Sequence, residues 1–439
     1  MILANWFSIR FLAALTLTVL AGVGLSACIN DNYAGGGDCA FVARANGVSL
    51  PDGLGVNIHF TAPAPGEVKM IAEAGFRWVR MDFKWDATET EKGRYDFTAY
   101  ERLLRELEAY KIRALFILDY GNPLYDNGAP PRTEHARQAF TRWAVAAAKH
   151  FKDRRIVWEI YNEPNHSIFW PPKTRAEEYV ALALSVGRAF RAEVPTEDLI
   201  GPAVSEMDYD FIEACLKAGL LEYWSAVSVH PYLRTNPEAA ALEYCRLRRM
   251  INEHSARTSL RREVQIVSSE WGYSSQWRGM NDQKQAEVFA REMLTNAAHG
   301  IPVSIWYDWR DDGPDPNDPE HHFGVVRNEY HSGRDPVYDP KPAYYAAQTL
   351  KRLFEGYVFD KRLEVGSESD YVLLFKNNGA LRIAAWSIST NPRRVTIPLS
   401  PGQFRITSHT GEDRGLARIA NQQLEVELSP APIYLIPKE

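Results

Sequence analysis

The sequence predicts a (β/α)8 barrel, a TIM barrel of the α/β class, followed by a small all-β domain. Between about Gly55 and Phe354, apolar β-favouring runs alternate with amphipathic helical stretches. Several of these runs stop at a polar or charged side chain, where parallel α/β folds carry their chemistry. After Phe354 the pattern changes to short alternating strands separated by turn residues. An open doubly wound sheet is the alternative, but it usually carries a Gly-rich turn after its first strand, and this chain has none.

The barrel strands are predicted from runs rich in valine, isoleucine and aromatic residues, which suit a buried pleated surface. They are Gly55–His59, Trp78–Asp82, Ala114–Asp119, Val157–Glu163, Leu199–Val204, Ala226–His230, Val264–Glu270 and Val303–Trp309. Between and after them, apolar residues recur with the helical period of 3.6. The predicted helices are Gly66–Ala74, Phe97–Lys111, Glu134–Phe151, Ala176–Glu193, Asp210–Ala218, Pro237–His254, Gln283–His299 and Pro342–Phe354.

The last part of the chain begins with a hairpin signature, in which Asn377-Asn378-Gly379 separates two apolar runs. Its predicted strands are Tyr371–Phe375, Leu381–Trp386, Val395–Leu399, Phe404–Thr407, Gln423–Leu428 and Ile433–Ile436. We therefore assign residues 50–354 to the barrel and residues 355–439 to a sandwich-like β domain that packs on it.

The N-terminus predicts export. Phe11 to Ala27 is an apolar run after Arg10, which is short for a membrane span and typical of a secretory signal. The run ends in Leu25-Ser26-Ala27-Cys28, which resembles the bacterial lipobox, so Cys28 is the expected lipidation site. Residues 29–49 then form a flexible tether. An uncleaved anchor or simple cleavage near Ala27 are the alternatives.

The composition excludes several functions. A net charge of −6 argues against a nucleic-acid surface. No CxxC pair, Gly-rich phosphate loop or His-Glu-x-x-His stretch occurs, so we expect no metal and no cofactor. After Cys28 the remaining cysteines are odd in number, so at most one disulfide forms, with Cys215 and Cys245 as one option.

Two glutamates stand out because each closes a predicted strand. Glu163 lies in Asn162-Glu163-Pro164, and Pro164 ends the run because proline cannot donate to a sheet ladder. Glu270 closes a later run and is followed by Trp271-Gly272. Two carboxylates at the strand ends of one sheet are what glycoside hydrolysis needs: one protonates the leaving oxygen and the other meets the sugar carbon.

Further polar residues close other strands and extend this candidate site. Arg80 could keep Glu270 ionised, because an adjacent cation lowers a carboxylate pKa; a salt bridge with Asp82 or Asp86 is the alternative. Asn162 would hold the 2-hydroxyl of the sugar. The remaining candidates for substrate binding at strand ends are His59, Asp119, His230, Tyr232, Trp306 and Trp309.

Asn-Glu-Pro closing a fourth strand, with Ser-Glu-Trp-Gly closing a seventh, resembles the retaining clan A glycoside hydrolases. The resemblance runs from about Gly55 to the end of the chain. It fits family 39 best, and within it the Psl-type endoglycosidases made alongside biofilm-matrix exopolysaccharides. It implies Glu163 as acid/base and Glu270 as nucleophile. It also implies that Tyr232 forms a hydrogen bond with the nucleophile. It implies further that Trp306 lies under the sugar, with Trp309 as the weaker choice.

The leading hypothesis is therefore a retaining endoglycosidase that acts on an exported polysaccharide, is held in the periplasm by a lipid anchor and works beside exopolysaccharide export machinery. An exo-acting xylosidase- or iduronidase-like enzyme is the first alternative, and a non-catalytic polysaccharide-binding barrel the second. Two long loops, Gly121–Arg132 and Asp311–Gly333, should shape the catalytic face. Four aromatics after strand ends favour a chain-binding surface: Trp85, Tyr125, Trp170 and Trp277. The sugar, its linkage and the oligomeric state stay open.

Overall fold

The computed structural model describes residues 49–233, 235–257, 262–399, 402–419 and 423–438. These residues belong to one compact unit. The predicted signal, Cys28 and the tether up to residue 48 lie outside the described residues. Within the described part, no helix has the length and apolar character needed to cross a membrane.

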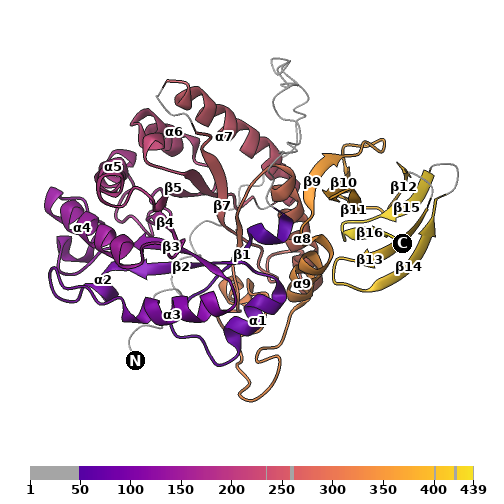
Figure 1. The fold of residues 1–439 in the computed structure, drawn as a ribbon, viewed down its shortest axis with the longest axis horizontal. Coiled ribbons are helices and arrows are strands. Elements are labelled where there is room, and N and C mark those ends of the chain that lie inside the picture. The colour runs from indigo at the N-terminus through magenta and orange to yellow at the C-terminus, as the bar shows by residue number, and fades with distance from the viewer. Residues whose placement is uncertain (1–48, 234, 258–261, 400–401, 420–422, 439) are drawn as a thin grey trace, which may run out of the picture. The chain divides into compact units, whose positions relative to one another are not determined.

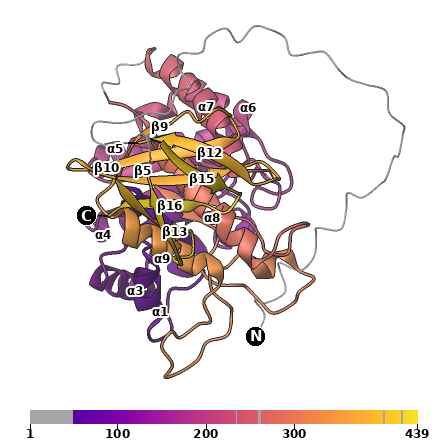
Figure 2. The same cartoon turned by 90° about the vertical axis from the view of Figure 1, so that its right-hand side faces the viewer.

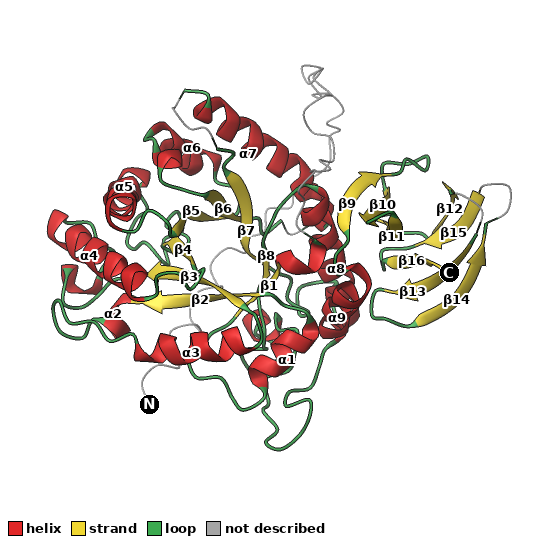
Figure 3. Ribbon diagram, viewed as in Figure 1, coloured by secondary structure: helices red, strands yellow, loops and turns green. Residues whose placement is uncertain are grey.

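Eight parallel strands of the described chain close into a barrel in the order β1 to β8, as the sequence predicted (Figure 1). They are β1 Leu54–Asn57, β2 Trp78–Lys84, β3 Arg113–Asp119, β4 Val157–Ile160, β5 Asp198–Ser205, β6 Ala226–His230, β7 Gln265–Trp271 and β8 Ser304–Trp306. Figure 3 shows helices surrounding these strands. They are α1 Glu67–Ala74, α2 Trp85–Thr88, α3 Thr98–Ala109, α4 Glu134–His150, α5 Ala176–Glu193, α6 Tyr209–Lys217, α7 Ala240–Ser255, α8 Asp282–Ala298 and α9 Pro342–Phe354.

Strand alternation divides the barrel residues between two apolar cores. A small core contains Trp78, Leu115, Ile117, Ile200, Ala226, Val267 and Ile305. A much larger core lies between the strands and the helices and takes the alternate positions, such as Trp158 and Ile160 on β4. Glu159 lies between these two residues, so its side chain points into the barrel. The same alternation directs Arg80, two residues after Trp78, toward the interior.

The described residues after position 354 form two antiparallel sheets, which confirms the predicted all-β region (Figure 2). A six-stranded sheet has the order β14-β13-β16-β11-β10-β9, and β12 pairs with β15. Their bounds are β9 Val358–Arg362, β10 Asp370–Asn377, β11 Ala380–Ser387, β12 Arg393–Pro398, β13 Gln403–Ser408, β14 Asp413–Arg418, β15 Gln423–Leu428 and β16 Ile433–Pro437. The sequence did not predict β9 and β14.

This β region packs on the barrel through aromatic and polar contacts. The ring of Phe354, at the end of α9, lies 4.9 Å from that of Phe375 and 5.2 Å from that of Tyr434. The indole of Trp386 donates to Glu238 at 2.6 Å. Because these side chains are buried, both faces of the larger sheet are covered, one by the barrel and one by β12 and β15.

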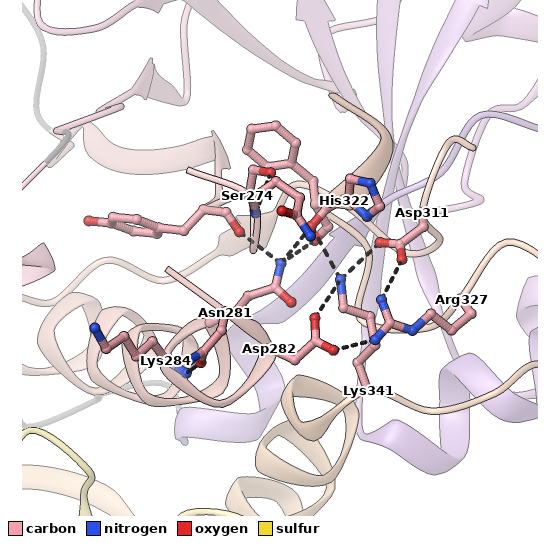
Figure 4. Close-up of polar contacts among 12 residues, drawn as sticks. Ser274, Asn281, Asp282, Lys284, Asp311, His322, Arg327 and Lys341 are labelled. Atoms are coloured by element: carbon pink, nitrogen blue, oxygen red, sulfur yellow. Dashed lines mark hydrogen bonds and ion pairs between the residues drawn. The ribbon is translucent and has the colours of Figure 1, made fainter. Parts of the chain in front are cut away.

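The long loop between β8 and α9 is anchored by a buried lysine (Figure 4). Lys341 is almost fully buried, and its ammonium donates to Asp311 at 2.9 Å and to the carbonyl of His322 at 3.2 Å. Arg327 pairs with the same Asp311 at 3.3 Å and with Asp282 on α8. The loop is therefore fixed to the helix layer close to where β8 ends.

Candidate active site

Arg80 is the centre of the polar network inside the strand ends. It is 1% exposed, and its hydrogen bonds are charge-assisted because the donor is a cation. Its Nε donates to Glu159 at 2.8 Å, its Nη1 to Glu270 at 2.6 Å, and its Nη2 to the amide oxygen of Asn162 at 2.8 Å. Burial lowers the pKa of Arg80, but the charges of Glu159 and Glu270 outweigh it and raise that pKa. The alternative pairing of Arg80 with Asp82 or Asp86 is wrong.

A bulge in β7 directs the side chain of Glu270 toward the site. Ser268 pairs with Ser304 and Trp271 with Trp306, so β7 carries one residue more than β8 over this stretch. The carboxylate of Glu270 accepts from Arg80 on one oxygen and from the hydroxyl of Tyr232, at 2.7 Å, on the other. Both of its oxygens are therefore held by donors, one of them a cation.

Glu163 lies beyond the strand rather than at its end. The ladder of β4 stops at Ile160, so the predicted strand Val157–Glu163 is three residues too long. The chain turns there, with φ of 42° at Glu163, and the Glu163 amide donates to the carbonyl of Ala203 at 3.0 Å. Ala203 is the extra residue of a second bulge, in β5. Burial raises the pKa of Glu163 to about 7, despite the opposing effect of His166.

His230 joins the two glutamates as a neutral side chain. Burial lowers its pKa to about 4. Its Nε2 lies 3.3 Å from Nη2 of Arg80, which can only donate, so Nε2 is the acceptor and Nδ1 carries the proton. Nδ1 then donates to Oε1 of Glu163 at 2.9 Å. The proton of the Glu163 carboxylic acid is consequently on Oε2.

The two carboxylates lie close together. One oxygen of Glu163, one of Glu270 and a ring nitrogen of His230 all lie within 4.8 Å of one another. Retaining glycosidases hold their carboxyl groups about 5–5.5 Å apart, whereas inverting enzymes need about 6.5–9.5 Å to admit a water. The same three groups could offer donors to a metal ion, but the guanidinium of Arg80 contacts two of them and opposes a second cation.

The structure also places Asp119 and His59 at the strand ends. Asp119 is fully buried at the end of β3, and neither of its oxygens has a hydrogen-bond partner among the described residues. Burial and the charge of Asp82 raise the pKa of Asp119 well above its usual range. His59 is 42% exposed and lies beside Asn57 and Asp308, away from Asp119 on the other side of β2.

The two tryptophans expected under the sugar do not lie there. Trp306 is fully buried against Phe289 of α8, and Trp309 is 1% exposed and donates to Glu67 of α1 at 3.0 Å. Ile305 belongs to the inner core, so its neighbour Trp306 must point outward. The prediction is therefore wrong, and Tyr307, which directly follows β8 and is partly exposed, is the aromatic residue next to the site.

The predicted aromatic surface needs a similar correction. Trp85 and Trp170 are fully buried and Tyr125 is 5% exposed, because all three pack against neighbouring helices and loops; Trp277 alone of the four is partly exposed. The expected disulfide option also fails, since Cys215 and Cys245 are not joined to each other.

Three residues at the site were not predicted: Asn57 and Glu159, which contact Arg80, and Tyr307, which lies nearby. Asn57 ends β1 and accepts from Arg80 at 3.4 Å. Glu159 balances the charge of Arg80. Burial raises the pKa of Glu159, but the charge of Arg80 and smaller effects of neighbouring side chains together outweigh it and lower that pKa. A charged residue in the middle of a short apolar strand was the available signal for Glu159, and a polar residue at a strand end was the signal for Asn57.

Known proteins resemble this fold. The most informative solved structure is a family 39 glycoside hydrolase from Bacteroides cellulosilyticus WH2, with 25% identity and a TM-score of 0.75 over 89% of this chain and 82% of that one. A GH39 β-xylosidase from Caulobacter crescentus is 15% identical, with a TM-score of 0.66 over 91% and 98% of the two chains. A GH30 endoxylanase from Clostridium papyrosolvens C71 is 11% identical, with a TM-score of 0.62 over 90% and 97%. The last two show the fold alone.

No curated protein matches the chain. The family model described as cellulase, glycosyl hydrolase family 5, matches residues 55–313, which is more than half of the 439 residues and contains both glutamates. The protein therefore belongs to the cellulase family, glycosyl hydrolase family 5, and is a clan A glycoside hydrolase.

Proposed function

We propose that this glycosidase is a retaining enzyme of the family 39 type that cleaves within the chains of an exported exopolysaccharide. One observation carries the retaining mechanism. Glu163 and Glu270 approach within 4.8 Å, while Arg80 and Tyr232 hold both oxygens of Glu270. Glu270 is thereby positioned as a nucleophile, and an approach within 4.8 Å is closer than the about 6.5–9.5 Å at which inverting enzymes hold their carboxyl groups to admit a water.

In the first step, a Glu270 oxygen forms a bond to the anomeric carbon while the bond from that carbon to the leaving oxygen breaks. Oε2 of Glu163 gives its proton to that oxygen. The sugar is then an ester of Glu270, which has lost its negative charge. In the second step, Glu163 takes a proton from water, the water oxygen attacks the anomeric carbon, and Glu270 leaves as the carboxylate.

Asn162 and His230 orient the groups that react. Oδ1 of Asn162 accepts from Arg80, which directs the amide N–H groups of Asn162 away from the arginine and makes them available to the 2-hydroxyl of the sugar. That interaction strengthens in the transition state. His230 keeps Oε1 of Glu163 occupied, so that Oε2 is the proton donor.

Partly exposed aromatic residues support action within a chain. Tyr120 and Phe169, which follow β3 and β4, stack at 5.8 Å between ring centroids. Trp277 and Tyr307 follow β7 and β8, on the opposite side of the closed barrel. Sugar rings pack on aromatic faces, so surfaces on both sides would hold sugar units on either side of the cleaved bond.

The family 39 assignment and the exported substrate rest on further observations. The likeness to the Bacteroides cellulosilyticus enzyme covers most of both chains at 25% identity, which supports the family 39 type. The apolar run before Cys28 supports export, with a lipid anchor on that cysteine at a periplasmic membrane surface. The Psl-type resemblance supports a matrix exopolysaccharide as substrate and export machinery as partner.

Azide rescue tests the two roles. We expect Glu163→Ala to form the glycosyl-enzyme from an aryl glycoside with an activated leaving group, and azide to restore its turnover with a glycosyl azide of retained configuration. Glu270→Gln should stay inactive. A glycosyl azide of inverted configuration from Glu163→Ala would refute the assignment.

Product sizes test the mode of action. Incubated with defined oligosaccharides, an endo-acting enzyme releases fragments of several lengths from the start, whereas an exo-acting one releases a single small sugar.

Detergent phase separation tests the anchor: the wild type should enter the detergent phase and Cys28→Ser should not.

A further inference from the structure

Two aspartates, Asp82 on β2 and Asp119 at the end of β3, lie at the strand ends and take no part in the mechanism above. The strands pair in parallel, and Asp82 lies opposite Ile117, which belongs to the small inner core. Paired residues face the same side of a sheet, so Asp82 points into the barrel, and Asp119, two residues after Ile117, does too. The two carboxyl groups are therefore inward-facing neighbours at the catalytic end of the barrel.

This aspartate pair borders the catalytic network. Burial raises the pKa of Tyr120, which follows β3, and the charges of Asp82 and Asp119 add to this rise while Arg80 opposes it. Tyr120 is therefore within electrostatic reach of both aspartates and of the arginine that holds Glu270. The side chain of Asp82 is 24% exposed, whereas Asp119 is fully buried. Of the two acids, only Asp82 can meet a bound sugar.

The surroundings of the pair decide which acid carries a proton. Burial raises the pKa of Asp119 well above its usual range, and the charge of Asp82 and its place within hydrogen-bonding reach add to this rise, against Lys84 and Arg80. Among the described residues, no N–H or hydroxyl group donates to either oxygen of Asp119, so its ionised form would be costly. Asp82 has a cation nearby, since its Oδ2 lies 3.8 Å from Nζ of Lys84. The proton therefore belongs on Asp119 and the charge on Asp82.

We propose that Asp119 is a positioning residue whose acid O–H donates to the carboxylate of Asp82, and that Asp82 accepts hydroxyl groups of the sugar unit bound beside the catalytic pair. A carboxylate has two oxygens with about four lone-pair sites, so one hydrogen bond from Asp119 leaves acceptors for the sugar. The 2-hydroxyl is assigned to Asn162, so Asp82 takes hydroxyl groups farther around the ring. The inference rests on the proposed function and adds a preference to it. A unit that lacks these hydroxyl groups, or carries a carboxylate in their place, should bind poorly.

Kinetics on the oligosaccharide that the wild type cleaves fastest test the role of Asp82. We expect Asp82→Ala to lower kcat/KM at least about tenfold, which is the scale of one hydrogen bond to a charged group. Lys84→Met is the matched control, because it removes the same half-exposed ion pair and leaves the acceptor; we expect a change of less than about twofold. Equal losses in the two variants, or no loss in Asp82→Ala, would overturn the contact between Asp82 and the sugar.

Two substitutions of Asp119 distinguish a proton donor from a charge. The amide N–H of asparagine can donate to Asp82 as the acid O–H does, whereas alanine cannot. We therefore expect kcat/KM of Asp119→Asn to exceed that of Asp119→Ala at least about tenfold. Equal losses in the two variants would mean that Asp119 acts as an ionised group, and the proposal would be wrong.

Infrared difference spectra of the full chain, wild type against Asp119→Asn at neutral pH, locate the proton without a substrate. The carbonyl of a carboxylic acid absorbs at a higher frequency than a carboxylate or an amide. We expect the variant to lose one carboxylic acid band, whereas loss of a carboxylate band would overturn the proposal. These spectra decide the matter if Asp119→Ala fails to fold. If no oligosaccharide is cleaved, the proposed function fails, while the infrared band still shows whether Asp119 holds the proton.

Discussion

At the scale of single residues, the two glutamates differ in what surrounds them. Glu270 accepts from a cation and a hydroxyl, whereas Glu163 accepts from a neutral imidazole in a buried position. Burial keeps Glu163 protonated up to about pH 7, which suits a group that must deliver a proton. Arg80 contacts Glu270 directly but reaches Glu163 only through His230, so its positive charge lies closer to Glu270 than to Glu163.

The first prediction concerns pH. Because the pKa of Glu163 is raised to about 7, its acid form dominates below that pH and is lost as pH rises. We expect kcat/KM on an unactivated glycoside to fall about tenfold per unit above about pH 7. In Glu163→Ala, assayed on an activated aryl glycoside, this fall should be absent. A fall that persists in the variant would assign the basic limb to another group.

The second prediction concerns the shape of the Arg80 side chain. Lysine keeps the charge but cannot hold Glu159, Glu270 and Asn162 at once, because it is a point donor rather than a planar fork. We expect Arg80→Lys to lower kcat/KM about 100-fold, or about 2.7 kcal/mol of transition-state stabilisation. Arg77→Lys, which alters an exposed pair with Glu355, is the control and should change kcat/KM less than twofold. Equal activity of both variants would contradict the role of the fork.

Residues were predictable from the sequence where a motif fixed their place. Asn162-Glu163-Pro164 and Glu270-Trp271-Gly272 brought the two glutamates together, and the Tyr232–Glu270 contact expected from the resemblance is present. Trp306 was misplaced because a strand as short as β8 gives no alternation from which to read the inward face. The bulges in β5 and β7 each insert one extra residue, which changes the side of the sheet toward which the following side chains point. These bulges left no signal in the sequence.

At the scale of elements, most helices and strands were predictable because their apolar period is clear. The two strands that were not predicted, β9 and β14, are the edges of the six-stranded sheet. Edge strands carry charged residues and little apolar alternation, as in Asp413–Arg418, since one side of their backbone has no strand partner. The loop after β8 was expected to shape the catalytic face, and the structure adds that a buried ion-pair network anchors it.

The third prediction tests that anchor. Lys341→Met removes the buried cation and leaves the buried Asp311 paired with Arg327 at 3.3 Å, and removing one partner of a buried ion pair costs up to about 3–5 kcal/mol. We expect the free energy of unfolding, from urea titration, to fall by about that amount. The control is Lys217→Met, which removes an exposed pair with Glu213 on α6 and should cost less than about 1 kcal/mol. Similar losses in the two variants would show that the anchor does not stabilise the loop.

At the scale of the whole molecule, the order of elements was enough to predict the barrel and the β region that follows it. What the order could not show is that the two share one core. Phe354, Phe375 and Trp386 belong to the same buried cluster as the barrel helices. Such contacts join residues from distant parts of the chain, and a pattern read along the sequence does not contain them.

The fourth prediction follows from this shared core. A chain that ends at Phe354 would expose the apolar surface that the β region covers, at a cost of about 1.5–3 kcal/mol for each large side chain. We expect this truncated chain in the insoluble fraction on expression, while a chain of residues 49–439 is recovered soluble. A soluble truncated barrel with native near-ultraviolet circular dichroism would show that the barrel is independent of the β region.

The central claim is that Glu163 and Glu270 act by double displacement. Proton NMR of the first-formed product tests it most directly, because the anomeric proton reports configuration before mutarotation mixes the two forms. Two displacements at one carbon predict a hemiacetal with the same configuration as the glycoside that was cleaved. A first product of opposite configuration would contradict the account, because it would require a water between two carboxylates that approach within 4.8 Å.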